Sequence, residues 1–178
     1  DREVGVMRVM LVTPLPRSFI LFAKIIAASI LSVFQVIVFL IVAALLGINT
    51  PFSTMVLIIP VAFLCGMLLG SIGLATTVYT KQIENFAGIM NFVIFPMFFF
   101  SSALYPLWKL RESGAEIVFR VAQINPFTHA VEIIRFAAYG KFNLISFAVV
   151  CGVCVLSFWL AVRGYNPNTG NIKKVKLP

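Results

Sequence analysis

Three long runs without a charged side chain constrain this chain more than any other feature. They extend from Ile25 to Thr80, from Asn85 to Trp108 and from Phe142 to Val162. An α-helix needs about 20 apolar residues to cross the hydrocarbon layer of a membrane. The first run is long enough for two such helices, and the turn-forming sequence GINTPFST at 47–54 divides it in two.

We therefore predict an all-α polytopic membrane protein in which residues 1–178 form one transmembrane domain. The composition agrees, because 61% of the residues are hydrophobic and 11% are charged, against about 45–50% and 25% in an average soluble domain. The lipid bilayer is the expected surrounding of the predicted transmembrane helices. These lie at 19–46, 55–79, 85–103 and 142–162.

The distribution of Lys and Arg predicts the orientation in the membrane. Four basic residues lie in the leading segment through Lys24, Lys81 follows the second predicted span, and four lie in the tail at 163–178. The segment 104–141 has five basic residues, partly balanced by three glutamates. Because basic residues are enriched in cytoplasmic segments, both ends of the chain are predicted to be cytoplasmic. The net charge of +8 then reflects topology and contact with anionic headgroups, so no nucleic-acid partner is expected.

The first 14 residues predict a short amphipathic helix. The chain starts without Met, and Val4, Met7, Met10 and Leu11 share one side of a helical wheel, opposite Arg8. Pro14 and Pro16 end this pattern, because proline cannot donate a backbone hydrogen bond. From the residues alone, this helix could simply rest on lipid headgroups.

The segment 104–141 predicts two short helices that are external or re-enter the membrane. The sequence SGAE at 113–116 has the spacing of a capping box and predicts a helix that ends near Gln123. A second helix is predicted to begin with Asn125 as its cap and Pro126 at its first position, and to end near Gly140. Glu132 and Arg135 have the spacing of an ion pair within this helix.

The sequence offers little catalytic chemistry. His129 is the only histidine, and there is no Gly-rich phosphate loop. No Asp, Glu, Lys or Arg stands in the middle of a predicted span, as a proton relay would need. The pair Cys151 and Cys154 lies mid-span, where a reactive thiolate would be poorly solvated. We therefore expect no catalytic residue, no metal site and no bound cofactor, and any transport would depend on a partner for energy.

A few residues at membrane depth are candidates for helix packing or for a transport path. Gly66 and Gly70 have the four-residue spacing that lets membrane helices approach closely. Gln35 and Asn91 are amides that could bond between helices or contact a substrate.

Three motifs together resemble ABC type-2 (ABC-2) transporter permeases, and in the right order. They are REVGVMRVMLVTP at 2–14, FPMFFFSSALYPL at 95–107 and NPFTHAVEIIRFAAYG at 125–140. The resemblance implies a fragment that holds spans three to six, with the first two spans missing before Asp1. Two positions depart from the family pattern: Arg8 stands where an acidic residue is common, and Ser102 replaces a usual glycine.

The resemblance implies that 1–14 is a coupling helix, which docks on a separate ATP-hydrolysing subunit. In this reading Met7 is a buried anchor beside Leu11, and Arg8 lies at the rim. The implied coupling residues are Glu3, Gly5, Met7, Arg8, Leu11, Thr13 and Pro14. The segment 104–141 is left open as external or re-entrant, and the candidate residues of a re-entrant segment are Pro106, Asn125, Pro126, Glu132 and Arg135.

The implied function is the permease subunit of an ATP-driven exporter in a bacterial cytoplasmic (inner) membrane. Its implied partners are a dimer of ABC ATPase subunits, which would bind ATP and Mg, and a second permease copy or homologue. The exported substrate is left open. Two alternatives also remain open: a non-transporting membrane scaffold, and an intramembrane transferase that would use Glu112, Glu116, Glu132 and His129.

Overall fold

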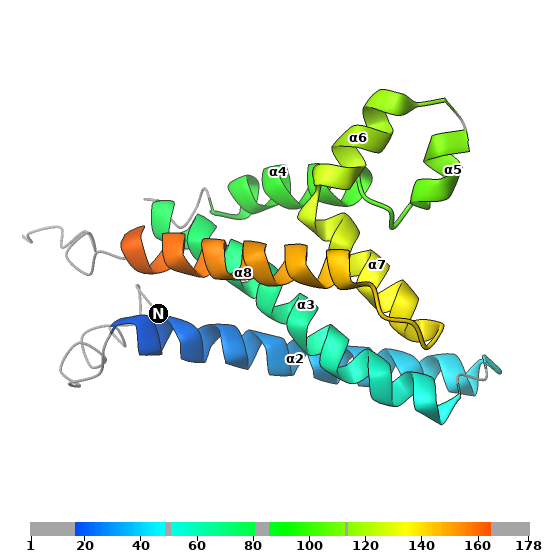
Figure 1. Cartoon of the computed structure of the whole chain (residues 1–178). Coiled ribbons are helices and arrows are strands. Elements are labelled where there is room, and N and C mark those ends of the chain that lie inside the picture. Colours follow the sequence, from blue (N-terminus) through cyan, green and yellow to red (C-terminus); the bar gives the residue numbers. More distant parts are fainter. Residues whose placement is uncertain (1–16, 49–50, 81–85, 113, 165–178) are drawn as a thin grey trace, which may run out of the picture.

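The computed structural model describes residues 17–48, 51–80, 86–112 and 114–164. In these ranges the protein is all-helical, as predicted, with no strand (Figure 1). The predicted coupling helix at 1–14 lies outside the described residues, as does most of the predicted tail. The helices are α2 (Arg17–Leu45), α3 (Phe52–Tyr79), α4 (Phe86–Phe99), α5 (Leu107–Glu112), α6 (Glu116–Ile124), α7 (Pro126–Ala138) and α8 (Leu144–Gly164).

Among the described residues, three helices are long and apolar enough to cross a membrane. They are the Ser18–Leu45 part of α2, the Ser53–Tyr79 part of α3, and α8. They coincide within a few residues with three of the predicted spans. Helices of this length and composition indicate an integral membrane protein.

The predicted span at 85–103 is not confirmed. Helix α4 has 14 residues, which extend about 21 Å at 1.5 Å per residue, whereas the hydrocarbon layer is about 30 Å thick. The helix ends because the chain tightens: the Ser101 amide bonds to the Phe98 carbonyl, three residues back. The Ser101 hydroxyl donates to the same carbonyl at 2.6 Å, and such side-chain bonds compete with helix continuation. Apolar composition does not reveal this break.

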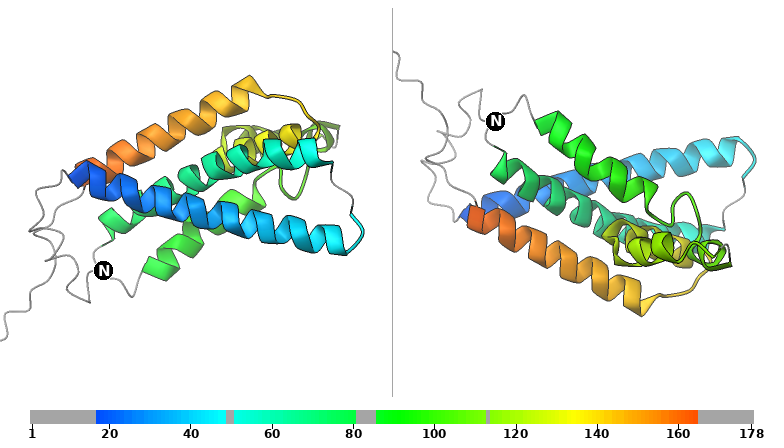
Figure 2. Two further views of the ribbon diagram at one scale, coloured as in Figure 1. Left: turned by 90° about the horizontal axis from the view of Figure 1, so that it is seen from below. Right: turned by 90° about the horizontal axis from the view of Figure 1, so that it is seen from above.

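Helix α3 is the centre of the arrangement. Helix α2 and helix α8 both pack along it, and α4 lies on the opposite side of α3 from α8 (Figure 2). Helix α7 packs against both α3 and α8. The buried core lies where α3, α7 and α8 meet, and it comprises Cys65, Leu68, Ala130, Ile133, Val150 and Cys154.

The directions of the helices show on which side of the bundle the described chain begins and ends. Helix α2 begins, α3 ends, α4 begins and α8 ends at one end of the bundle (Figure 1). The α2–α3 connection and helices α5 to α7 lie toward the other end. The described chain thus begins and ends on the same side, and α4 runs antiparallel to α3 although it is short.

Three short helices, rather than the two predicted, occupy the segment between α4 and α8. Helix α5 was not predicted. Helix α6 starts at Glu116, with Ala115 as its cap and without a side-chain capping bond. The predicted capping box is therefore wrong. It required Glu116 at the third helical position, whereas Glu116 is the first helical residue. Ser113 itself lies outside the described residues. The predicted end of α7 is confirmed, since Gly140 follows it with φ of +66°.

Gly66 and Gly70 both face α2, and their surroundings differ. A Cβ atom on Gly66 would lie 3.0 Å from the Ser29 Cα atom and 3.0 Å from the Ser32 Cβ atom. A Cβ atom on Gly70 would be 3.6 Å from the Ala28 Cβ atom, an ordinary contact. The small-residue spacing therefore does serve helix packing, and Gly66 is the position where the backbone of α2 is close.

We expect Gly66→Ala to lower the free energy of unfolding by about 1–3 kcal/mol, because the added methyl group meets the Ser29 Cα atom, which cannot rotate away. Gly70→Ala is the matched control and should change it by less than about 0.5 kcal/mol, since ordinary contact distance remains. Thermal unfolding of the full-length protein in detergent measures both. Equal shifts for the two variants would contradict the packing assigned to Gly66.

Candidate functional site

The junction between α6 and α7 contacts the last turn of α4. Asn125 is buried and caps α7 as predicted, because its Oδ1 atom accepts from the Phe127 amide at 3.0 Å. Its Nδ2 atom donates to the Met97 carbonyl at 2.6 Å and to the Phe100 carbonyl at 3.2 Å. One side chain therefore caps the start of α7 and the end of α4 together.

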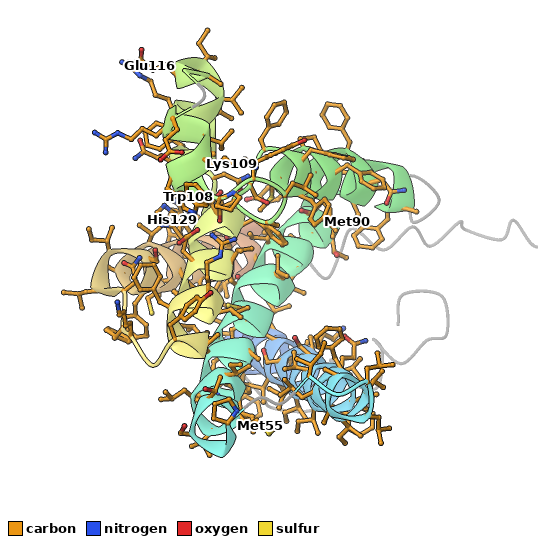
Figure 3. The ribbon with its side chains drawn as sticks, turned by 90° about the vertical axis from the view of Figure 1, so that its right-hand side faces the viewer. Met55, Met90, Trp108, Lys109, Glu116 and His129 are labelled. Atoms are coloured by element: carbon orange, nitrogen blue, oxygen red, sulfur yellow. The ribbon has the colours of Figure 1, made fainter. Side chains whose placement is uncertain are left out.

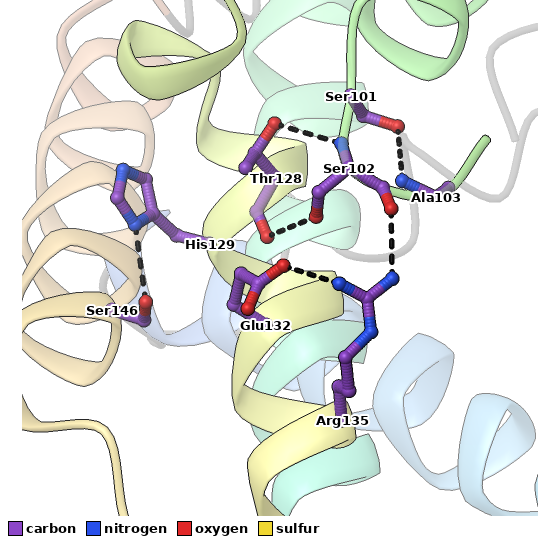
Figure 4. Close-up of polar contacts among 8 residues, drawn as sticks. All are labelled: Ser101, Ser102, Ala103, Thr128, His129, Glu132, Arg135 and Ser146. Atoms are coloured by element: carbon purple, nitrogen blue, oxygen red, sulfur yellow. Dashed lines mark hydrogen bonds and ion pairs between the residues drawn. The ribbon is translucent and has the colours of Figure 1, made fainter. Parts of the chain in front are cut away.

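A second set of contacts joins the turn after α4 to the same face of α7 (Figure 4). The Ser102 amide donates to the Thr128 hydroxyl at 3.3 Å, and the Ser102 hydroxyl donates to the Thr128 carbonyl at 3.4 Å. Arg135 donates from Nη2 to the Ser102 carbonyl at 2.8 Å and from Nη1 to Glu132 at 2.6 Å. The predicted ion pair is confirmed. We call these residues the α4–α7 clamp: Ser102, Asn125, Thr128, Glu132 and Arg135.

The α4–α7 clamp accommodates a serine at position 102, where the family usually has a glycine. Ser102 and Thr128 have no exposed surface, and the amide, hydroxyl and carbonyl of Ser102 are all bonded to α7. A glycine there would keep the two backbone bonds and lose the hydroxyl bond. The departure from the family pattern is thus accommodated by an added contact with α7.

The four residues proposed for the transferase alternative do not form one site. Glu132 is paired with Arg135, and Glu116 is paired with Arg120 on the exposed face of α6. Glu116 lies at the outer end of α6, away from His129 (Figure 3). The Nδ1 atom of His129 lies 3.2 Å from the Ser146 hydroxyl and its Nε2 atom lies 2.9 Å from the Gln123 carbonyl, so this histidine joins α6, α7 and α8.

No group of three His, Cys, Asp or Glu side chains among the described residues could hold a metal ion. Cys151 and Cys154 are both free thiols on α8, and Cys154 is buried in the core. Their place in a transmembrane helix is as predicted. Cys65 on α3 donates to the Ala130 carbonyl of α7 at 3.6 Å, so it also takes part in packing.

The other predicted residues are dispersed. Gln35 and Asn91 are exposed on α2 and α4, and in the described ranges neither side chain is hydrogen-bonded to another helix. Pro106 precedes α5, and its carbonyl accepts from the Lys109 amide at 3.0 Å. The seven predicted coupling residues at 3–14 lie outside the described residues.

Sequence reasoning missed Ser102 and Thr128 as members of the site. A signal was present, because Asn125, Thr128, Glu132 and Arg135 are spaced by three, four and three residues. That spacing places polar side chains along one face of a helix. The pattern indicates a polar stripe but does not say which element it contacts.

Comparison with known proteins decides the family. The sequence profile of the ABC-2 type transporter family matches residues 1–139, which is most of the chain. The chain belongs to the ABC-2 type transporter family. The resemblance seen in the three motifs is thereby confirmed, and the match extends from the N-terminal segment of this ABC-2 protein to the end of α7.

One curated relative of this ABC-2 protein is Nodulation protein J of Rhizobium leguminosarum bv. viciae. The two are 30% identical over 101 residues, which are 57% of this chain and 37% of the relative. The match thus covers little more than a third of the relative's length. No solved structure matches this ABC-2 protein.

Proposed function

We propose that this chain is part of the permease subunit of an ATP-driven exporter, and that its helices line or border the path of the exported molecule. The observation that carries the proposal is the family match over residues 1–139. That match begins in the segment proposed as the coupling helix and includes the clamp. The family is a transporter family, which supports a role in membrane transport.

In the proposed mechanism, the energy comes from a separate dimer of ABC ATPase subunits. ATP and Mg bind to those subunits, their closure displaces the coupling helix at 1–14, and α2 then transmits the displacement to the bundle. Helix α2 is a good transmitter because it follows the segment directly and packs along α3. A second permease copy or homologue completes the path, and the assembly lies in a bacterial cytoplasmic membrane.

The transferase alternative is disfavoured by the geometry described above, since Glu116 and Glu132 are each engaged in an ion pair. The scaffold alternative differs from a permease in what it does with ATP. A scaffold would bind the ATPase without coupling hydrolysis to movement of a substrate. A measurement of that coupling therefore distinguishes a scaffold from a permease.

Purification of the full-length permease from its native membrane tests the proposal. We expect a P-loop ATPase to be recovered with it in near-equal amounts, and the complex in lipid nanodiscs to hydrolyse ATP. Replacement of the P-loop lysine of that ATPase should abolish hydrolysis without releasing the permease. Recovery of the permease without any ATPase would reject the proposal.

The proposed topology makes a separate prediction. Single cysteines placed at Asn49 and Ser113 of a cysteine-free full-length permease should react with a membrane-impermeant maleimide added outside. Cysteines at Lys81 and Lys174 should react only after the membrane is opened, because these positions are proposed to be cytoplasmic. External labelling at position 81 would contradict this orientation.

A further inference from the structure

The end of α4 poses a physical problem for a chain in a membrane. The last carbonyl groups of a helix have no partner within the helix, and an unsatisfied backbone group in hydrocarbon costs several kcal/mol. Helix α4 is apolar apart from Asn91 and stops after 14 residues. Its terminal region nevertheless has three carbonyls satisfied by α7, those of Met97, Phe100 and Ser102.

The donors to these carbonyls are Asn125 and Arg135. Together with Thr128 and Glu132 they follow the three–four–three spacing of a single helical stripe on α7. The other face of α7 carries Ala130 and Ile133, which are buried in the core with residues of α3 and α8. Helix α7 therefore has a polar face toward α4 and an apolar face toward the body of the bundle.

Helix α4 has few other attachments among the described residues. None of its residues is buried. Its contact with α3 includes the Met90 Cε atom, which is 3.6 Å from where a Cβ atom of Gly73 would lie. At its other end the Phe98 and Phe127 rings lie edge to face at 6.0 Å, beside the clamp. Loss of the clamp would therefore free the end of α4 and leave α7 in the core.

We propose that Asn125 and Arg135 are positioning residues. Their side chains extend from α7 and bond the carbonyls at the C-terminal end of α4, so the position of α4 depends on the position of α7. A shift of α7 relative to α3 and α8 then moves α4 with it. The use of this linkage in transport rests on the proposed permease function, whereas the hold of α7 on α4 is independent of it. The two can thus fail separately.

Two substitutions of Asn125 separate its two capping roles. Asn125→Asp and Asn125→Ser both retain an oxygen that accepts from the Phe127 amide, so both keep the cap of α7. Asp has no donor, and the Ser hydroxyl is too short to reach both α4 carbonyls. Gln123→Glu is the charge control for Asn125→Asp, since it adds a negative charge on exposed α6 outside the clamp.

The measurement is hydrogen–deuterium exchange of the full-length permease in lipid nanodiscs. We expect the amides at 100–103 to exchange at least tenfold faster in Asn125→Asp and Asn125→Ser. The amides at 127–130 should keep their wild-type rate, and Gln123→Glu should leave both segments unchanged. Unchanged exchange at 100–103 overturns the proposal. Faster exchange in both segments also overturns it, because Asn125 would then act only on the folding of α7.

A covalent link should replace the clamp. Cysteines at Phe98 and Phe127, joined by a short bifunctional thiol reagent in a protein otherwise free of cysteine, should restore slow exchange at 100–103 to Asn125→Asp. If the Asn125 variants do not accumulate, Thr128→Val serves in their place, because it removes only the hydroxyl that accepts from the Ser102 amide. Failure of the link to restore protection, or no effect of Thr128→Val, counts against the proposal.

Discussion

Leu11→Asp in the full-length permease is expected to abolish recovery of the ATPase, or to uncouple ATP hydrolysis from transport, while the permease still inserts in the membrane. The reason is that a coupling helix must fit a groove, so a buried apolar anchor matters more than affinity for lipid. Leu11 shares the apolar side of the predicted helix with Met7. Affinity recovery of the ATPase with wild-type and variant permease measures the effect.

Arg8→Asp is the control for that experiment, because Arg8 lies on the opposite side of the predicted helix. A polar contact at the rim changes orientation and rate more than affinity, so a modest loss is expected. A helix that only rests on lipid predicts the reverse: Arg8→Asp would change membrane contact, and Leu11→Asp would bind the ATPase as before. Equal recovery with unchanged coupling for Leu11→Asp would refute the coupling role.

Arg135→Ala is expected to lower the free energy of unfolding by about 3 kcal/mol. Removal of one member of a buried ion pair leaves the other charge without compensation, and this costs about 3–5 kcal/mol. The Glu132 side chain is 11% exposed and that of Arg135 is 32% exposed, which places the expected loss at the lower end. Unfolding of the full-length permease in mixed micelles, titrated with denaturing detergent, measures it.

Arg120→Ala is the matched control, because Arg120 forms an ion pair with Glu116 that is 73% and 70% exposed. An exposed pair on one helix contributes about 0.3–0.5 kcal/mol, so the control should change the free energy of unfolding by no more than about 0.5 kcal/mol. Similar losses for Arg120→Ala and Arg135→Ala would show that burial of the Glu132–Arg135 pair contributes little.

Local features of the site were predictable from the sequence. Asn125 and Pro126 predicted the start of α7, and Glu132 and Arg135 predicted an ion pair, because capping and i,i+3 pairing depend on neighbours along the chain. The same reasoning could not show that the amide nitrogen of Asn125 donates to α4. These two bonds join residues that are 28 and 25 positions apart, and no local sequence pattern predicts such long-range contacts.

Gly66 and Gly70 illustrate a second limit. The spacing predicted close helix packing, and the structure places both against α2. The Ser29 backbone lies against Gly66, whereas only side-chain and more distant atoms lie against Gly70. Which glycine cannot carry a side chain therefore depends on how α2 and α3 cross. That crossing is set by the surfaces of both helices and is not encoded in the spacing along one of them.

By itself the sequence determined that this is an all-α membrane protein, where its long helices lie and to which family it belongs, because apolar length and short motifs are read along one chain. The tertiary structure alone decided that α4 is short and that α7 completes it. The run without charged residues extends through Ser101 and Ser102 to Trp108. Whether a helix can stop there depends on partners for its last carbonyls, and in this protein those partners come from another helix.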